Sequence, residues 1–111
     1  MNIEQREQAG VVILELAGKI IGGPDATTLN DKLHDLVEKG SNKVVADLSQ
    51  VNWMNSSGLG ILISALTTTQ NAGGQLKIAA ATEKIKKLLT ITKLTNVFTL
   101  YETVDEAVAS F

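Results

Sequence analysis

The stretch that most constrains the fold of this chain covers residues 47–60, because it joins two apolar patterns of different period. At its beginning, residues 43–48 (Lys-Val-Val-Ala-Asp-Leu) form a short apolar run that is typical of a buried strand. From its end onward, apolar residues recur at helical spacing and predict an amphipathic helix with core positions at Leu59, Leu62, Ile63 and Leu66. The stretch therefore predicts a strand, a turn and a helix start in direct succession.

Residues 55–57 (Asn-Ser-Ser) lie where this helix is predicted to begin. Short polar side chains are favoured there because their oxygens accept hydrogen bonds from the first backbone N–H groups. The same N–H groups and the positive end of the helix dipole favour an anion, so a phosphate on Ser56 or Ser57 would be stabilised by its surroundings. A structural interpretation also explains these residues: they are only a helix cap, and Gly58 and Gly60 mark close backbone packing.

Residues 47–49 (Asp-Leu-Ser), followed after five residues by 55–60 (Asn-Ser-Ser-Gly-Leu-Gly), resemble the signature of the STAS domain. Within that family the pattern is most similar to the bacterial anti-sigma-factor antagonists, and the resemblance covers nearly the whole chain. It implies a protein that binds an anti-sigma factor, which is also a serine protein kinase, and so frees a sigma factor. The kinase then phosphorylates the first serine of the turn, and the pair separates. By position that serine is Ser56, with Ser57 as the second choice.

Two departures from the family pattern bear on this serine. The residue before it is Asn55, where the antagonists usually carry Asp. The loop at residues 18–25 (Gly-Lys-Ile-Ile-Gly-Gly-Pro-Asp) is about one residue longer than the family's Gly-x-Leu/Ile-Asp, and Ile21 stands at the acidic position. Asp25 is the candidate to take over the acidic role. Both departures bear more on whether the serine is phosphorylated than on the fold of the chain.

The face around Ser56 is expected to dock the partner kinase, and a PP2C-type phosphatase is a further expected partner. Ile61 lies off the apolar stripe of its helix, so it is predicted to be exposed beside the serine. A phosphate would add roughly −1.5 to −2 charges to this surface and would act on the interface without unfolding the helix. Trp53 and Met54, just before the turn, are predicted to be buried or half-buried in packing at the core or its edge, rather than to contact the partner. The residues expected to contact the partner are Asn55, Ser57, Gly58, Gly60, Ile61, Ser64 and Asp25.

The rest of the chain alternates between strand and helix patterns. Residues 3–7 and 11–20 predict a hairpin, and 11–20 is apolar on both faces, as a strand inside a sheet requires. The order of elements predicts a single α/β domain over residues 1–111, with a mixed sheet of about five strands and about four α-helices. The further predicted elements are a helix from Pro24 to a cap at Gly40, a strand at 75–80, a helix capped by Thr82, a strand at 97–101, and a last helix with the capping box Thr103 and Glu106.

Composition limits the classes of function. With 111 residues, 44% of them apolar and 20% charged, the chain suits one globular domain. A net charge of −2 predicts no direct binding of nucleic acid, and no apolar run approaches the ~20 residues of a membrane span. The chain has no cysteine, and residues 1–7 are polar and mixed in charge, unlike a secretory signal. We therefore expect a cytoplasmic protein without membrane insertion.

Enzyme and metal-site motifs are missing from the sequence. It has neither a Gly-x-Ser-x-Gly elbow nor a Gly-x-x-x-x-Gly-Lys phosphate loop, and Ser56 has no candidate base nearby in the sequence. The only histidine, His34, lies beside Asp31 and Asp35, but a metal needs more ligands than this group offers, so His34 is predicted to be a solvated surface residue. We expect no catalysis, no metal and no cofactor.

Two alternatives stay open at the level of the sequence. The chain could instead be a non-switching STAS module that scaffolds a signalling or transporter complex, and Ser56 would then be only a cap. The second alternative concerns Lys84, Lys86 and Lys87, which form a basic cluster on a predicted helix. Such a cluster is either a solvated face, which is the commoner case, or a surface for an acidic partner.

Overall fold

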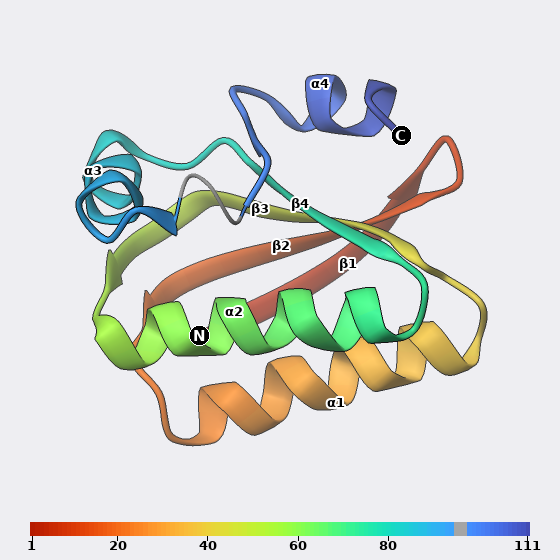
Figure 1. Ribbon diagram of the computed structural model, residues 1–111, viewed down its shortest axis with the longest axis horizontal. Helices are drawn as coiled ribbons and strands as arrows, with labels where there is room; N and C mark the ends of the chain where they lie inside the picture. Colours follow the sequence, from red (N-terminus) through yellow and green to blue (C-terminus); the bar gives the residue numbers. More distant parts are fainter. Residues whose placement is uncertain (95–97) are drawn as a thin grey trace.

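The computed structural model describes residues 1–94 and 98–111, and it shows a sheet with helices on both of its faces (Figure 1). The elements, in chain order, are β1 (Asn2–Gln8), β2 (Val11–Ile20), α1 (Pro24–Glu38), β3 (Lys43–Met54), α2 (Ser56–Asn71), β4 (Gln75–Ala79), α3 (Glu83–Ile91), β5 (Leu100–Tyr101) and α4 (Val104–Ala109). Pro24 begins α1, where a missing backbone N–H is tolerated. Gly40 follows the end of α1 with a φ of 80°, as predicted for a helix-terminating glycine.

The strands lie in the order β1-β2-β3-β4-β5. β1 and β2 are antiparallel and are joined at Ala9 and Gly10, whose φ angles of 53° and 79° suit the tight turn of a twisted hairpin. The other neighbouring strands are parallel, because a helix crosses over between the members of each pair. The mixed five-stranded sheet and the four helices predicted from the sequence are confirmed.

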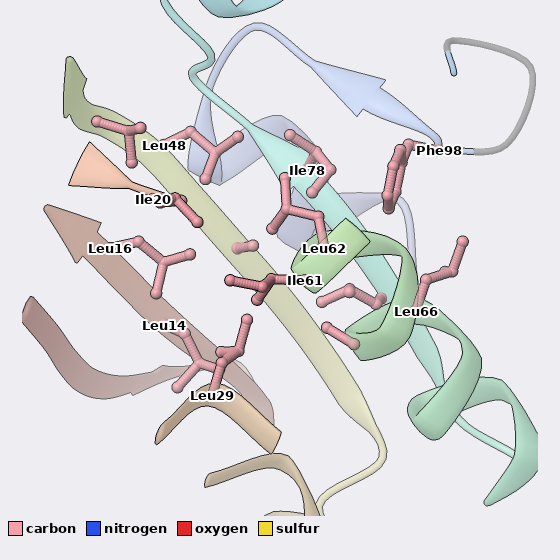
Figure 2. Close-up of a cluster of buried hydrophobic side chains, with 14 of the residues drawn as sticks. Leu14, Leu16, Ile20, Leu29, Leu48, Ile61, Leu62, Leu66, Ile78 and Phe98 are labelled. Atoms are coloured by element: carbon pink, nitrogen blue, oxygen red, sulfur yellow. The ribbon is translucent and has the colours of Figure 1, made fainter. Parts of the chain in front are cut away.

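Two apolar cores lie on opposite faces of the sheet. The larger core lies between the sheet and helices α1 and α2, and Figure 2 shows its central side chains. The smaller core lies under α4 and includes Val11, Ile13 and Val45. β2 sends alternate residues into both cores, which explains why its sequence is apolar on both faces. α3 packs beside β3 and adds Ile85 and Leu89 to the larger core.

Strand β3 is longer than the apolar run at residues 43–48 predicts. It continues to Met54, and its pairing with β2 extends to Ile20 opposite Met54. Residues 49, 50 and 52 are polar and do not resemble a continuing buried strand. The register between β2 and β3 shifts twice, which interrupts the simple alternation of buried and exposed residues along β3. As a result, the carboxyl end of β3 leads directly into Asn55 and the start of α2.

The C-terminal elements agree in part with their predictions. β5 covers only two residues of the predicted strand at 97–101, and residue 97 lies outside the described residues. Thr103 caps α4, since its Oγ1 accepts a hydrogen bond from the backbone N–H of Glu106 at 3.1 Å. α4 ends at Ala109, and Phe111 packs against the smaller core.

Lys77 joins α4 to the sheet. Its side chain leaves β4 on the face of the smaller core and is 9% exposed. Its Nζ donates hydrogen bonds to the backbone oxygen (3.1 Å) and the Oγ (2.7 Å) of Ser110. The same ammonium group lies 4.2 Å from the centre of the Phe111 ring, which is a favourable cation–π distance.

We expect Lys77→Ala to lower the free energy of unfolding by about 1–3 kcal/mol, because charge-assisted hydrogen bonds and a cation–π contact are lost together. Urea unfolding followed by circular dichroism measures the change. Lys43→Ala is the control, since Lys43 is exposed at the start of β3, and it should stay within about 0.5 kcal/mol of the unchanged protein. Equal losses in the two variants would contradict this role of Lys77.

Candidate functional site

The turn between β3 and α2 is built around Asn55, which caps the helix. Asn55 has an extended backbone, and its Oδ1 accepts a hydrogen bond from the backbone N–H of Gly58 at 2.8 Å. Its carbonyl accepts the N–H of Leu59 at 3.0 Å and so begins the helical hydrogen-bond pattern. Ser56 and Ser57 are the first two residues of α2, and their N–H groups precede that pattern. The predicted helix cap is therefore confirmed.

Asn55 also connects this turn to the loop between β2 and α1. Its Nδ2 donates to the carbonyl oxygen of Ile21 at 3.4 Å. The backbone N–H of Ile21 in turn donates a long hydrogen bond of 3.5 Å to Oδ2 of Asp25. The other carboxylate oxygen of Asp25 lies 3.4 Å from the amino group of Met1. The predicted site residues Asn55 and Asp25 are therefore linked through Ile21.

Gly58 lies where α2 crosses the end of β2. A Cβ atom at this position would collide with the carbonyl oxygen of Ile20 and would lie 2.8 Å from Cγ of Met54. Side chains do not tolerate such contacts with a backbone oxygen, so only glycine fits this crossing. Gly60 differs, because a Cβ atom built on it meets nothing within 4 Å among the described residues. Packing therefore requires glycine at position 58. It does not require glycine at position 60, so Gly60 is free to serve another role.

The polar residues of the site form one exposed strip at the start of α2. Ser57, Gly60 and Ser64 are exposed, and their spacing of three and four residues places them on one side of the helix. Ser56 is also exposed, and Asn55 is half-buried. The structure thus brings these five predicted site residues together, with Asp25 linked to them through the neighbouring loop.

The prediction that Ile61 is exposed is wrong. Ile61 is 6% exposed and points into the larger core (Figure 2), whereas Ile63, predicted as a core residue, is 37% exposed. The crossing at Gly58 turns the side of α2 that carries Gly58, Ile61 and Leu62 toward the sheet. Residues 59–66 are apolar on more than one side, so periodicity alone left the rotation of the helix undetermined. Gly58 and Ile61 therefore support the site from inside and are buried away from any partner.

The prediction that Trp53 and Met54 pack in the core or at its edge holds only for Met54, which is 4% exposed. Trp53 is 41% exposed, and Nζ of Lys84 lies 4.5 Å from the centre of its indole ring. Successive residues of a strand face opposite sides, so the burial of Met54 turns Trp53 outward. The alternation along the strand was the signal in the sequence from which the exposure of Trp53 could have been predicted. It places a large aromatic side chain on the surface two residues before Asn55.

The described ranges 1–94 and 98–111 contain no group of His, Cys, Asp and Glu arranged to hold a metal ion. His34 is exposed on α1, in agreement with its prediction as a solvated residue. None of the helices in these ranges is long and apolar enough to cross a membrane. The capped start of α2, with its exposed serines and its link to the β2–α1 loop, is the candidate functional site.

Comparison with known proteins identifies the family of this chain. Residues 2–107 match the family model of the STAS domain. A Thermotoga neapolitana protein, the TM1081 homolog, is 30% identical over 73 residues, which cover 66% of this chain and 65% of that protein. The anti-sigma-B factor antagonist of Bacillus subtilis is 28% identical over 97 residues, which cover 87% of each chain. The crystal structure of TM1081 from Thermotoga maritima matches with a TM-score of 0.85 at 26% identity, over 97% of this chain and 92% of that one.

The family match and the geometry of the site concern the same part of the molecule. The matched region includes both loops that Asn55 connects and the whole of α2. The structural match extends over 97% of the chain, so it concerns the α/β fold and not only the turn. The chain therefore belongs to the STAS domain family and resembles, within it, the anti-sigma factor antagonists.

Proposed function

We propose that this chain is an anti-sigma-factor-antagonist-like regulator, which binds an anti-sigma factor with serine kinase activity and separates from it when Ser56 is phosphorylated. The observation that carries the proposal is the position of Ser56, which is exposed at the first residue of α2, directly after the cap at Asn55. A hydroxyl at this position is accessible to a kinase. The hydrogen bonds of Asn55 to Gly58 and Ile21 hold the surrounding loops in place.

Packing favours Ser56 over Ser57 as the modified residue. Both serines are exposed, but Ser57 lies against the loop between β2 and α1. A Cβ atom built on Gly22 of that loop would be 3.0 Å from Cβ of Ser57, so there is little room for added bulk on that side. This crowding supports the assignment to Ser56.

The start of α2 suits a phosphate electrostatically. The N–H groups of Ser56 and Ser57 and the positive end of the helix dipole favour an anion there. The first turn of α2 contains no acidic residue, and Asn55 is neutral, so the phosphate meets no like charge from these residues.

The modification would act on the interface rather than on the fold. It would add roughly −1.5 to −2 charges to the exposed strip and so repel the partner. The core beneath the strip, with Gly58 and Ile61, would be unaffected because both residues face the sheet. A PP2C-type phosphatase would restore the binding form. The chain itself needs no catalytic group for this role.

The intact mass of the protein purified from its own cells, before and after phosphatase treatment, tests the assignment, with the site mapped by fragmentation. We expect a phosphatase-sensitive phosphate on Ser56, which Ser56→Ala abolishes and Ser57→Ala retains. A phosphate on Ser57, or none under any growth condition, overturns it. We also expect the partner captured by Ser56→Ala to bind Ser56→Asp at least about tenfold more weakly, since charge enters the interface. Equal binding of both variants would instead indicate a non-switching scaffold.

Asn55→Asp is expected to change the rate at which the partner kinase phosphorylates Ser56 by several-fold. The new carboxylate either orients the serine hydroxyl, which raises the rate, or repels the incoming phosphate, which lowers it. The free energy of unfolding should fall by no more than about 1 kcal/mol, because Asp caps helices as well as Asn does and only the long, exposed hydrogen bond from Nδ2 to the carbonyl oxygen of Ile21 is lost. Initial rates with the purified kinase and urea unfolding measure the two quantities. Equal rates would show that residue 55 has no part in phosphorylation.

A further inference from the structure

Large apolar side chains that reach solvent gather beside the Ser56 turn. The described part of the chain has four exposed large apolar residues, and three of them line one continuous surface. They are Ile21 (48% exposed), Trp53 (41%) and Ile91 (76%), and they come from the β2–α1 loop, the end of β3 and the end of α3. Apolar residues that collect from separate elements mark an interaction surface more than isolated ones do.

Two hollows meet on this surface, and Trp53 and Lys84 line both of them. The first has a volume of about 410 Å³ and is also lined by Lys19, Ile21 and Asn52. The second has a volume of about 250 Å³, follows α3 and is also lined by Met54, Ile85, Lys87, Leu88 and Ile91. Nζ of Lys84 lies 4.5 Å from the centre of the indole ring, so the two side chains that the hollows share are in contact with each other. We call the two hollows together the Trp53–Lys84 surface.

The charged residues of the Trp53–Lys84 surface are all basic. Lys19, Lys84 and Lys87 line it, and no carboxylate does so among the described residues, although the chain as a whole has a net charge of −2. Lys86, on the same helix, is different: its Nζ lies 2.9 Å from Oε2 of Glu102, and the hydrogen bond to this carboxylate raises the pKa of Lys86. The lysine cluster of α3 is thus divided between one ion-paired residue and two residues that face the hollows.

We infer that the Trp53–Lys84 surface docks an acidic segment of the partner protein. An aromatic or branched apolar side chain of that segment enters a hollow, and carboxylates on either side of it contact the lysines. Exposed tryptophan is enriched among the residues that contribute most to protein interfaces, and basic residues around it select an acidic partner. The second hollow is walled mainly by aliphatic side chains, so it fits an apolar side chain better than a nucleobase, which needs hydrogen-bonding groups.

The inference rests on the proposed function in one respect, since it assigns this segment to the partner that also docks at Ser56. The two surfaces are contiguous: Trp53 lies three residues before Ser56, and Ile21 accepts a hydrogen bond from Asn55. A phosphate on Ser56 would then place negative charge beside the surface that receives the acidic segment. Both the steric and the electrostatic effect of the phosphate would favour release of the partner.

A nuclear magnetic resonance titration of the ¹⁵N-labelled full chain tests the inference. The probe is a synthetic peptide in which one phenylalanine is flanked on both sides by glutamates. We expect it to shift the indole N–H signal of Trp53 and the amide signals of α3. Lys84→Glu should weaken binding at least about fivefold, since it replaces an attraction by a repulsion. Lys43→Glu, at the opposite end of β3, is the matched control and should change the affinity less than about twofold.

Two control peptides and two other ligands complete the experiment. A peptide with lysines in place of the glutamates, and one with alanine in place of the phenylalanine, should not shift these signals. The inference is overturned if the glutamate peptide leaves them unchanged, if Lys43→Glu weakens binding as much as Lys84→Glu, or if only ATP or phosphatidylglycerol vesicles shift them. These results are separate from the phosphate assignment, because a phosphorylated Ser56 with no peptide binding refutes only the docking surface. Peptide binding without a phosphate refutes only the switch.

Discussion

Gly58→Ala is expected to lower the free energy of unfolding by about 3 kcal/mol or more. The added Cβ atom would meet the carbonyl oxygen of Ile20, its carbonyl carbon at 2.9 Å and Cγ of Met54 at 2.8 Å. Two of these atoms belong to the backbone of β2, so relief requires α2 to move away from the sheet. Since small domains are stable by only about 5–15 kcal/mol, a change of this size lowers the urea midpoint markedly or prevents folding. Urea unfolding, together with the yield of soluble protein, measures it.

Gly60→Ala is the matched control, because it makes the same chemical change two residues further along the same helix. A Cβ atom on Gly60 meets nothing within 4 Å of the described residues, and Gly60 is exposed. Alanine favours a helix over glycine by about 0.5–1 kcal/mol, so this variant should be more stable than the unchanged protein. The two substitutions, Gly58→Ala and Gly60→Ala, should therefore change the free energy of unfolding in opposite directions. A loss of stability in Gly60→Ala, or none in Gly58→Ala, would contradict the packing described for this crossing.

The second large effect is expected for Ile61→Ala, with a loss of about 2–4 kcal/mol. Ile61 is 6% exposed, and Figure 2 shows it among the side chains between α2 and the sheet, so truncation leaves a cavity in the larger core. Ile63→Ala is the control, since Ile63 is 37% exposed and should lose less than about 0.5 kcal/mol. Urea unfolding of the pair measures the two losses and so tests which side of α2 faces the sheet. Equal losses, or a larger loss for Ile63→Ala, would mean that the helix presents another side to the sheet.

Together these variants separate support of the site from contact with a partner. Gly58 and Ile61 are buried, and their replacement should change stability. Gly60 and Ser64 are exposed on the strip beside Ser57, and their replacement should change partner binding with little change in stability. Gly60→Ala is informative in both assays, because it places a methyl group on the proposed interface while it stabilises the helix. A switch that acts on an interface needs such a division between a rigid base and an accessible surface.

Much of the fold could be predicted because its signals are local. The cap at Asn55, the capping residue Thr103 and the glycine after α1 each depend on side-chain and backbone chemistry within a few residues. The alternation of strand and helix patterns then allows few topologies, and the mixed sheet with parallel later strands is the expected one, which the structure has. The serines of the site could be located for the same reason, since they lie next to the cap.

Several features that the sequence did not predict join segments that are distant in the chain. The extension of β3 to Met54 depends on its pairing with β2, across a shifted register that no local pattern of β3 reveals. The meeting of Trp53 with Lys84 joins the end of one strand to a helix about thirty residues later, and neither residue alone indicates it. The link between Asn55 and Ile21 is of the same kind.

The sequence by itself determined the order and type of the elements, the position of the capped turn and the family resemblance. Only the tertiary structure decided which side of α2 meets the sheet, and with it which residues of the site are accessible. The physical reason is that residues 59–66 are apolar on more than one side, so hydrophobic periodicity allows several rotations of the helix. One close contact, between Gly58 and the backbone of Ile20, selects among them, because only a residue without a side chain can occupy that crossing.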